Sequence, residues 1–147
     1  MFVLLALLTF LVPAPPSSPA TWSFACVGAK DGLAVVELKA ELEPGWHLYA
    51  LDLPSDQGPI PTSITMKASK DYALFGAVLE PLPVEAYDDN FAMLVRYHAG
   101  TPTFTLKVKP LVSRAFDVEG EVVFMVCNDK TCLPPVAVPF RVTVPAS

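Results

Sequence analysis

A strict two-residue alternation of apolar and polar side chains constrains the fold of this chain more than any other feature. In residues 33–42 the apolar side chains of one face are Val36, Leu38, Ala40 and Leu42, and the residues between them are charged. This period is that of a strand with one buried face. Residues 104–109 and 138–144 repeat it, and no window of eleven or more residues has a clean helical period. The pattern therefore predicts an all-β protein.

Prolines and turn signals divide the rest of the chain into short strands. Further strands are predicted at residues 46–51, 63–67, 92–97 and 121–126. The sequence holds 16 prolines, and we expect them at strand ends, edges and loops because proline cannot donate to a central ladder. Many short strands with proline-rich connections predict an immunoglobulin-like β-sandwich of two antiparallel sheets.

The N-terminus resembles an export signal. Residues 2–12 are apolar throughout and are followed by a proline-rich segment, but the run is too short for a membrane span of about 20 residues. We predict a signal peptide at residues 1–20, cut after Ala20 or at the alternative Ala14, and a single domain at residues 21–147. No Lys or Arg precedes the run, so a retained N-terminal anchor stays open as an alternative to cleavage. Lipidation at Cys26 is a second alternative.

Charge and hydropathy narrow the range of partners. The net charge is −5 and the lysines are scattered, so no basic stripe is available to neutralise nucleic-acid phosphates. No second run has the length of a membrane span. We therefore expect no nucleic-acid partner and no membrane span once the signal is removed; a membrane partner would be a separate chain.

Two cysteines flank a four-residue turn. Cys127 ends the predicted strand on the face of Val123 and Met125, Asn128 and Asp129 supply turn chemistry, and Cys132 begins the return strand. Residues facing each other across a ladder have Cβ atoms about 4.5 to 5.5 Å apart, near the spacing of a disulfide. So short a loop gains only about 2 kcal/mol from closure. The spacing alone leaves a structural disulfide, redox exchange and metal binding open.

Metal binding is the weakest of these readings. The remaining nitrogen and sulfur ligands are His47, His98 and Cys26, and none has zinc-site spacing to the pair. Copper handling by cysteine, methionine and histidine is a further alternative. We predict no metal and no cofactor. We also expect Cys26 to be buried, because its neighbours Phe24 and Val27 are apolar, and His98 to lie on the surface in a turn.

Four segments, in this order, resemble one known family, the N-terminal periplasmic domain of the thiol:disulfide interchange protein DsbD. They are residues 44–49 (PGWHLY), 58–63 (GPIPTS), 87–91 (YDDNF) and 124–135 (FMVCNDKTCLPP). The last is the most specific. The resemblance runs from about Trp22 to Val144 and implies an immunoglobulin-like fold. This sequence has no transmembrane electron-carrying domain and no thioredoxin-like domain beside this one, so we expect a stand-alone version of the family's N-terminal domain.

The resemblance also implies a function and the roles of the cysteines. It implies a periplasmic oxidoreductase that relays electrons from a membrane-embedded or thioredoxin-like donor to oxidised, thioredoxin-like periplasmic proteins. Cys132 would form the mixed disulfide with the partner, and Cys127 would resolve it. The residues alone do not make this assignment, because either sulfur can be attacked. A non-catalytic binding or assembly module with a structural disulfide is the alternative.

In the family a cap loop covers the cysteines with an aromatic ring, and the matching residues here are Asp88, Asp89, Asn90 and Phe91. Phe91 would be the lid; a solvated turn is the plain alternative. Carboxylates of Asp88, Asp89 and Asp129 near the pair would raise the thiol pKa. The family also places tyrosines of the 44–49 segment beside the cysteines. Tyr49 fits this pattern, whereas His47 stands where some members have tyrosine and would lower the thiol pKa if charged.

Overall fold

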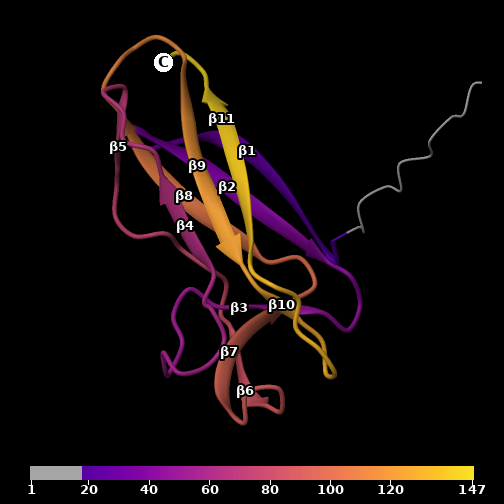
Figure 1. Cartoon of the computed structure of the whole chain (residues 1–147). Helices are drawn as coiled ribbons and strands as arrows, with labels where there is room; N and C mark the ends of the chain where they lie inside the picture. The colour runs from indigo at the N-terminus through magenta and orange to yellow at the C-terminus, as the bar shows by residue number, and fades with distance from the viewer. Residues whose placement is uncertain (1–17) are drawn as a thin grey trace, which may run out of the picture.

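The computed structural model describes residues 18–147, which form eleven strands and contain no helix (Figure 1). The strands make three antiparallel sheets. The first, in order, has β1 (Ala20–Lys30), β2 (Leu33–Leu42), β8 (Thr103–Pro110) and β5 (Tyr72–Leu74). The second has β11 (Val136–Val144), β9 (Phe116–Phe124) and β4 (Ser63–Met66). The third has β10 (Val126–Cys127), β3 (His47–Tyr49), β7 (Met93–Ala99) and β6 (Val84–Asp88).

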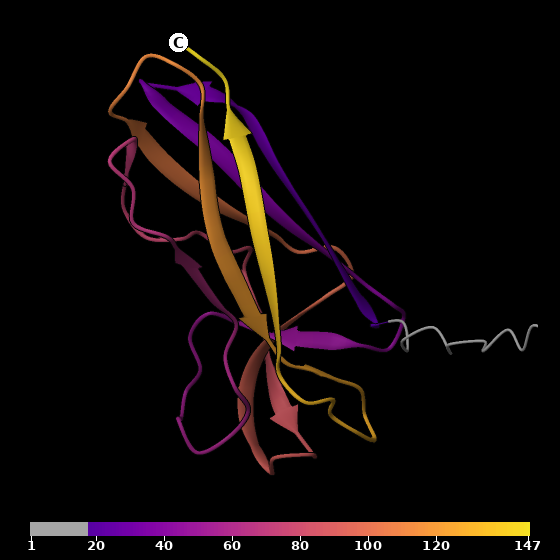
Figure 2. The same ribbon diagram turned by 45° about the horizontal axis from the view of Figure 1, so that its top comes forward.

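The first two sheets pack against each other and enclose the main core (Figure 2). Strand β2 pairs with both β1 and β8, and its inward residues Val36 and Leu38 have no exposed surface. Val118 and Val122 of β9 meet them from the second sheet in the same apolar cluster. The strands β1 and β11 lie side by side along one edge. The predicted all-β, immunoglobulin-like fold is confirmed, but the strands form a third sheet in addition to the two that were predicted.

The third sheet lies at the end of the sandwich opposite the C-terminus (Figure 1). The chain of the strand predicted at residues 121–126 reaches this sheet by changing partners at Met125. Up to Phe124 the strand pairs with β11 and β4, whereas from Val126 it pairs with β3. The alternation continues through the bend: Val126 joins the main core, while Met125 and Cys127 enter a second cluster. One uninterrupted stretch of sequence thus connects the stable core to the cysteine pair.

Two expectations about single residues are corrected. Cys26 is half-buried rather than buried: like Trp22 and Phe24 of the same edge strand, it packs against the main core with part of its surface exposed. His98 is buried in β7, not exposed in a turn, and its Nε2 lies 2.8 Å from Oε2 of Glu80. Strand β7 runs to Ala99 and the chain bends at Gly100, so the predicted turn does not include His98.

The predicted signal peptide lies almost entirely outside the described residues. Its proposed end, Ala20, is the first residue of β1 and pairs with Leu42. The carbonyl of the preceding Pro19 accepts a hydrogen bond from the backbone N–H of Glu43 at 2.9 Å. The domain boundary at residue 21 stays a prediction. Within residues 18–147 there is no helix of the length and apolar character needed to cross a membrane.

Candidate redox site

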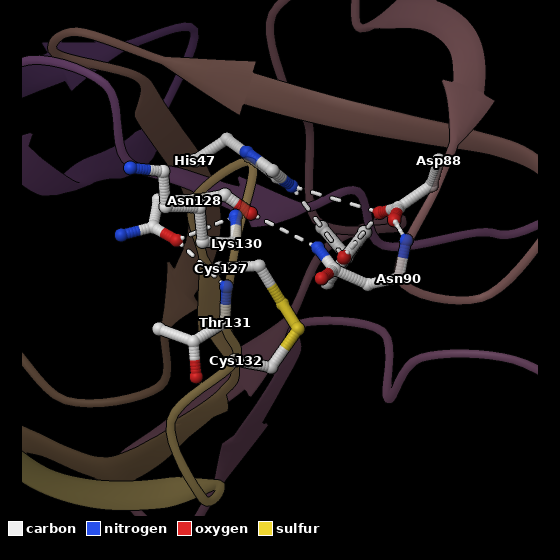
Figure 3. The surroundings of a disulfide bond; sticks show 9 residues. His47, Asp88, Asn90, Cys127, Asn128, Lys130, Thr131 and Cys132 are labelled. Atoms are coloured by element: carbon white, nitrogen blue, oxygen red, sulfur yellow. Dashed lines mark hydrogen bonds and ion pairs between the residues drawn. A yellow bond between two sulfur atoms is a disulfide. The ribbon is translucent and has the colours of Figure 1, made fainter.

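Strand β10 and a tight turn bring the two cysteines together. Cys127 pairs with His47 of β3 on one side and forms an isolated bridge with Cys132 on the other. The two are joined by a disulfide, with Cα atoms 4.0 Å apart (Figure 3). Cys127 has no exposed surface, whereas Cys132 is partly exposed. A molecule approaching from solvent therefore meets Cys132 first.

The turn is organised by Asn128 and does not depend on the sulfur bond alone. The side-chain oxygen of Asn128 accepts hydrogen bonds from the backbone N–H groups of Lys130 and Thr131, at 2.9 and 2.8 Å. The backbone N–H of Asn128 donates to the carbonyl of Thr131 at 2.9 Å. An asparagine that bonds the backbone two and three residues ahead stabilises a turn locally. The hairpin therefore has hydrogen bonds that hold its shape when the disulfide is open.

The disulfide belongs to a small apolar cluster, separate from the main core. We call it the disulfide cluster; its buried members are Tyr49, Val95, Met125 and Cys127. Leu53, Phe91, Met93, Tyr97 and Cys132 pack against it and are partly buried. Met125 was predicted to lie on the same strand face as Cys127, and it is a member of this cluster. Val95, Tyr97 and Leu53 were missed, because no local pattern relates β7 and the loop after β3 to the cysteines.

Residues 88–91, which match the family's cap loop and keep that name below, lie against the cysteine hairpin, residues 127–132. The cap loop follows from the pairing of Asp88 with Met93, which closes the β6–β7 hairpin beside β3. The side-chain N–H of Asn90 donates to the carbonyl of Asn128 at 2.9 Å (Figure 3). The ring of Phe91 packs against the disulfide cluster, edge-on to Tyr49 at a centroid distance of 6.1 Å. Asp89 is exposed and makes no contact of this kind.

A buried carboxylate anchors the base of the cap loop. Asp88 has only 5% of its side chain exposed. Its Oδ2 accepts a hydrogen bond from the hydroxyl of Tyr49 at 2.6 Å, and its Oδ1 accepts one from the backbone N–H of Asn90 at 2.8 Å. Nε2 of His47 lies 3.8 Å from Asp88 Oδ2 and 3.4 Å from the Tyr49 hydroxyl. These groups connect β3 with the cap loop.

Burial shifts the pKa values of His47 and Tyr49, the two residues beside Asp88. Loss of solvent lowers the pKa of His47, although the nearby Asp88 carboxylate acts in the opposite direction. Burial also raises the pKa of Tyr49, and its hydrogen bond to Asp88 adds to the effect. At neutral pH the carboxylate therefore faces a neutral imidazole and a neutral phenol.

Asp129, in the exposed hairpin turn, lines a cleft of about 210 Å³ together with His47 and Asp88.

The fold and the site define a class: an immunoglobulin-like domain whose disulfide closes a very short loop between a buried and a partly exposed cysteine. Residues 15–143 match the family described as thiol:disulfide interchange protein DsbD, N-terminal. The chain belongs to that family, which confirms the resemblance of its motifs. The disulfide between Cys127 and Cys132 agrees with the interchange chemistry for which the family is named.

Two solved structures have the same fold. The N-terminal domain of Neisseria meningitidis DsbD, in its reduced form, is 14% identical over 90% of this chain and 91% of that one, with a TM-score of 0.59. The N-terminal periplasmic domain of ScsB from Proteus mirabilis is 15% identical over 92% of this chain, with a TM-score of 0.57. This chain spans 51% of that ScsB domain. No curated protein matches the sequence.

Proposed function

We propose that the protein is a periplasmic protein thiol–disulfide oxidoreductase that relays electrons through Cys127 and Cys132. The observation that carries this proposal is a disulfide in a very short loop, with one sulfur-bearing residue fully buried and the other partly exposed. A loop of this length contributes little stability, so the bond can open without unfolding the domain. The predicted signal peptide and the periplasmic relative ScsB support the location.

The partial exposure of Cys132 supports its role as the attacking thiol. In the reduced protein the Cys132 thiolate attacks one sulfur of a partner's disulfide, forms a mixed disulfide and releases the partner's other sulfur as a thiolate. The Cys127 thiolate then attacks the Cys132 sulfur and displaces the partner's second thiolate. The partner gains two electrons and two protons, and Cys127 and Cys132 return to the disulfide. A donor dithiol reverses these steps to reload the protein.

The partners we propose are thioredoxin-like proteins. The acceptors would be oxidised periplasmic proteins of this kind, and the donor a membrane-embedded or thioredoxin-like dithiol. The general family chemistry supports such partners, since interchange needs a second dithiol or disulfide at each step.

The cap loop would protect the reduced pair in an oxidising compartment. Phe91 packs against the disulfide cluster and limits access from that side. Asp88 is buried nearby, and Asp89 and Asp129 extend the negative charge around the hairpin. Carboxylates disfavour the thiolate and raise the thiol pKa. The depressed pKa of His47 leaves its ring neutral, so it does not offset them.

The reduction potential tests the redox proposal. The protein carrying Cys26→Ser is equilibrated in graded thiol buffers, and alkylated thiols are counted by mass. A potential between about −120 and −270 mV, the range of exchange proteins, is the expected result. A potential below about −300 mV would mark a structural bond and favour the binding-module alternative.

Trapping experiments test the assignment of the two sulfurs. In Cys127→Ser the mixed disulfide cannot be resolved, so a thioredoxin-like partner should accumulate in a covalent complex on a non-reducing gel. Cys132→Ser should give none, because the remaining sulfur is buried. The reverse pattern would exchange the two roles.

Removing the ring of Phe91 tests the lid. In the chemically reduced Cys26→Ser protein, Phe91→Ala should speed alkylation of Cys132 by iodoacetamide, because the thiol loses its apolar cover. Phe75→Ala is the matched control, since that ring is 55% exposed in the connection from β5 to β6. Equal alkylation rates in Phe91→Ala and wild type would indicate that the cap loop is only a turn.

A further inference from the structure

The carboxamide of Asn90 makes a contact that the proposed chemistry does not use. It donates to the carbonyl of Asn128, the residue directly after Cys127, across 38 positions of sequence. Within residues 18–147 it is the only hydrogen bond between the cap loop and the cysteine hairpin. Phe91 covers the cluster by apolar packing, which has no preferred direction, whereas this bond has a defined donor and acceptor.

The acceptor is held in place by the turn itself. Asn128 uses its side-chain oxygen and its N–H inside the turn, so its carbonyl is the group left to face the cap loop. None of these bonds includes a cysteine sulfur. The acceptor should therefore keep its position in both the disulfide and the dithiol state.

The donor is also fixed before it meets the hairpin. The backbone N–H of Asn90 bonds Oδ1 of the buried Asp88, and Oδ2 of Asp88 holds the Tyr49 hydroxyl. A line of hydrogen bonds thus runs from β3 through the cap loop to the hairpin. Asn90 is not among the described residues with positive φ, so its backbone does not require asparagine.

We propose that Asn90 is a positioning residue that latches the cap loop onto the cysteine hairpin in both redox states. The latch rests on the proposed role of the cap loop and adds a step to it: a partner must break the bond from Asn90 to Asn128 before it reaches Cys132. The residue acts on access to the thiol and takes no part in the electron transfer.

Native-state alkylation measures the latch. The Cys26→Ser protein is reduced chemically and treated with iodoacetamide, and the rate is divided by the rate for the same thiols in unfolding denaturant. Loss of one neutral hydrogen bond should raise the opening equilibrium, and therefore the rate in Asn90→Ala, by about two- to tenfold. Asn90→Leu keeps the approximate shape, lacks the donor and adds no charge, so it should also be faster. Gln57→Ala, which removes an exposed carboxamide bonded only to its neighbour Asp56, should match wild type.

A second variant separates a latch from a general loss of structure. In a Phe91→Ala background the cap no longer covers the thiol, so adding Asn90→Ala should change the rate little. Urea unfolding midpoints of all variants identify any loss of the global fold. The latch is overturned if Asn90→Ala alkylates at the wild-type rate, or if its effect keeps its full size without the Phe91 ring. The assay uses chemically reduced protein, so it reports the latch even if the potential of the pair contradicts the relay.

Discussion

The main core and the disulfide cluster lie in one small domain but are built differently. The main core fills the space between long ladders, such as the nine paired residues of β9 and β11. The disulfide cluster draws on β10 and β3, which have two and three residues, and on the seven-residue β7. It is bordered by the hydrogen bonds that run from Tyr49 to Asn128. The comparison indicates a division of labour. We expect the ladders to supply most of the stability and the few bonds around the site to break without unfolding the sandwich.

The largest effect should come from the main core. Leu38 has no exposed surface and lies in the central ladder between β1 and β8. Leu38→Ala should lower the free energy of unfolding by about 2 to 5 kcal/mol, through lost burial and a residual cavity. Urea denaturation measures this loss. If the two regions are independent, the potential of the cysteine pair in the folded variant should equal that of wild type; a shifted potential would show that they are coupled.

A smaller effect is expected from Tyr49→Phe, which keeps the ring but removes the hydroxyl bonded to Asp88. Asp88 is almost completely buried, and its Oδ2 would lose the Tyr49 donor while Oδ1 keeps the N–H of Asn90; an unsatisfied buried acceptor costs about 1 to 3 kcal/mol. Denaturation should show this loss, together with faster alkylation of the reduced Cys132.

Tyr72→Phe is the matched control for Tyr49→Phe. Its hydroxyl donates to the carbonyl of Lys67 at 2.7 Å, outside the disulfide cluster. It should lose some stability but leave alkylation unchanged. If Tyr72→Phe also exposed Cys132, the two regions would not be separate.

Reduction of the disulfide should lower the free energy of unfolding by less than most core substitutions do. The cysteines are five residues apart, and closing so short a loop contributes about 2 kcal/mol in the chain-entropy model. The difference in unfolding free energy between the oxidised and reduced Cys26→Ser protein measures it. The bonds within the Asn128 turn should keep the reduced hairpin folded. A cost well above 3 kcal/mol would instead identify the bond as a staple of the fold.

The smallest effect should be a pH dependence from His47. Its pKa is lowered by burial, so below the unfolded value of about 6.5 the unfolded chain binds a proton that the folded chain does not. The free energy of unfolding should therefore fall as the pH decreases from 7.5 to 5.5. His47→Gln should reduce this slope. Equal slopes in wild type and variant would show that the Asp88 carboxylate cancels the effect of burial.

The sequence allowed much of the scaffold to be predicted. The alternation of residues 33–42 corresponds to β2, and the strands at residues 104–109 and 138–144 correspond to β8 and β11. Strands β1, β5 and β6 were not predicted. β5 and β6 have three to five residues in partly exposed positions and carry no clear period, whereas residues 22–27 of the longer edge strand β1 were interpreted only as an apolar stretch. The buried pairing of His98 with Glu80 was missed as well, because the partner comes from a distant connection.

The sequence by itself determined the all-β class and the hairpin spacing of the two cysteines, because strand periodicity and turn chemistry are local properties; the cap residues were indicated only by the resemblance to the family. Only the tertiary structure decided which groups meet. It carried the strand of Cys127 from one sheet to another at Met125, placed Asp88 between Tyr49 and Asn90, and brought Asn90 to the carbonyl of Asn128. The physical reason is separation in sequence. A hydrogen bond between residues 38 positions apart forms only when the sheets pack so that the two residues meet, and no local pattern of residues encodes that packing.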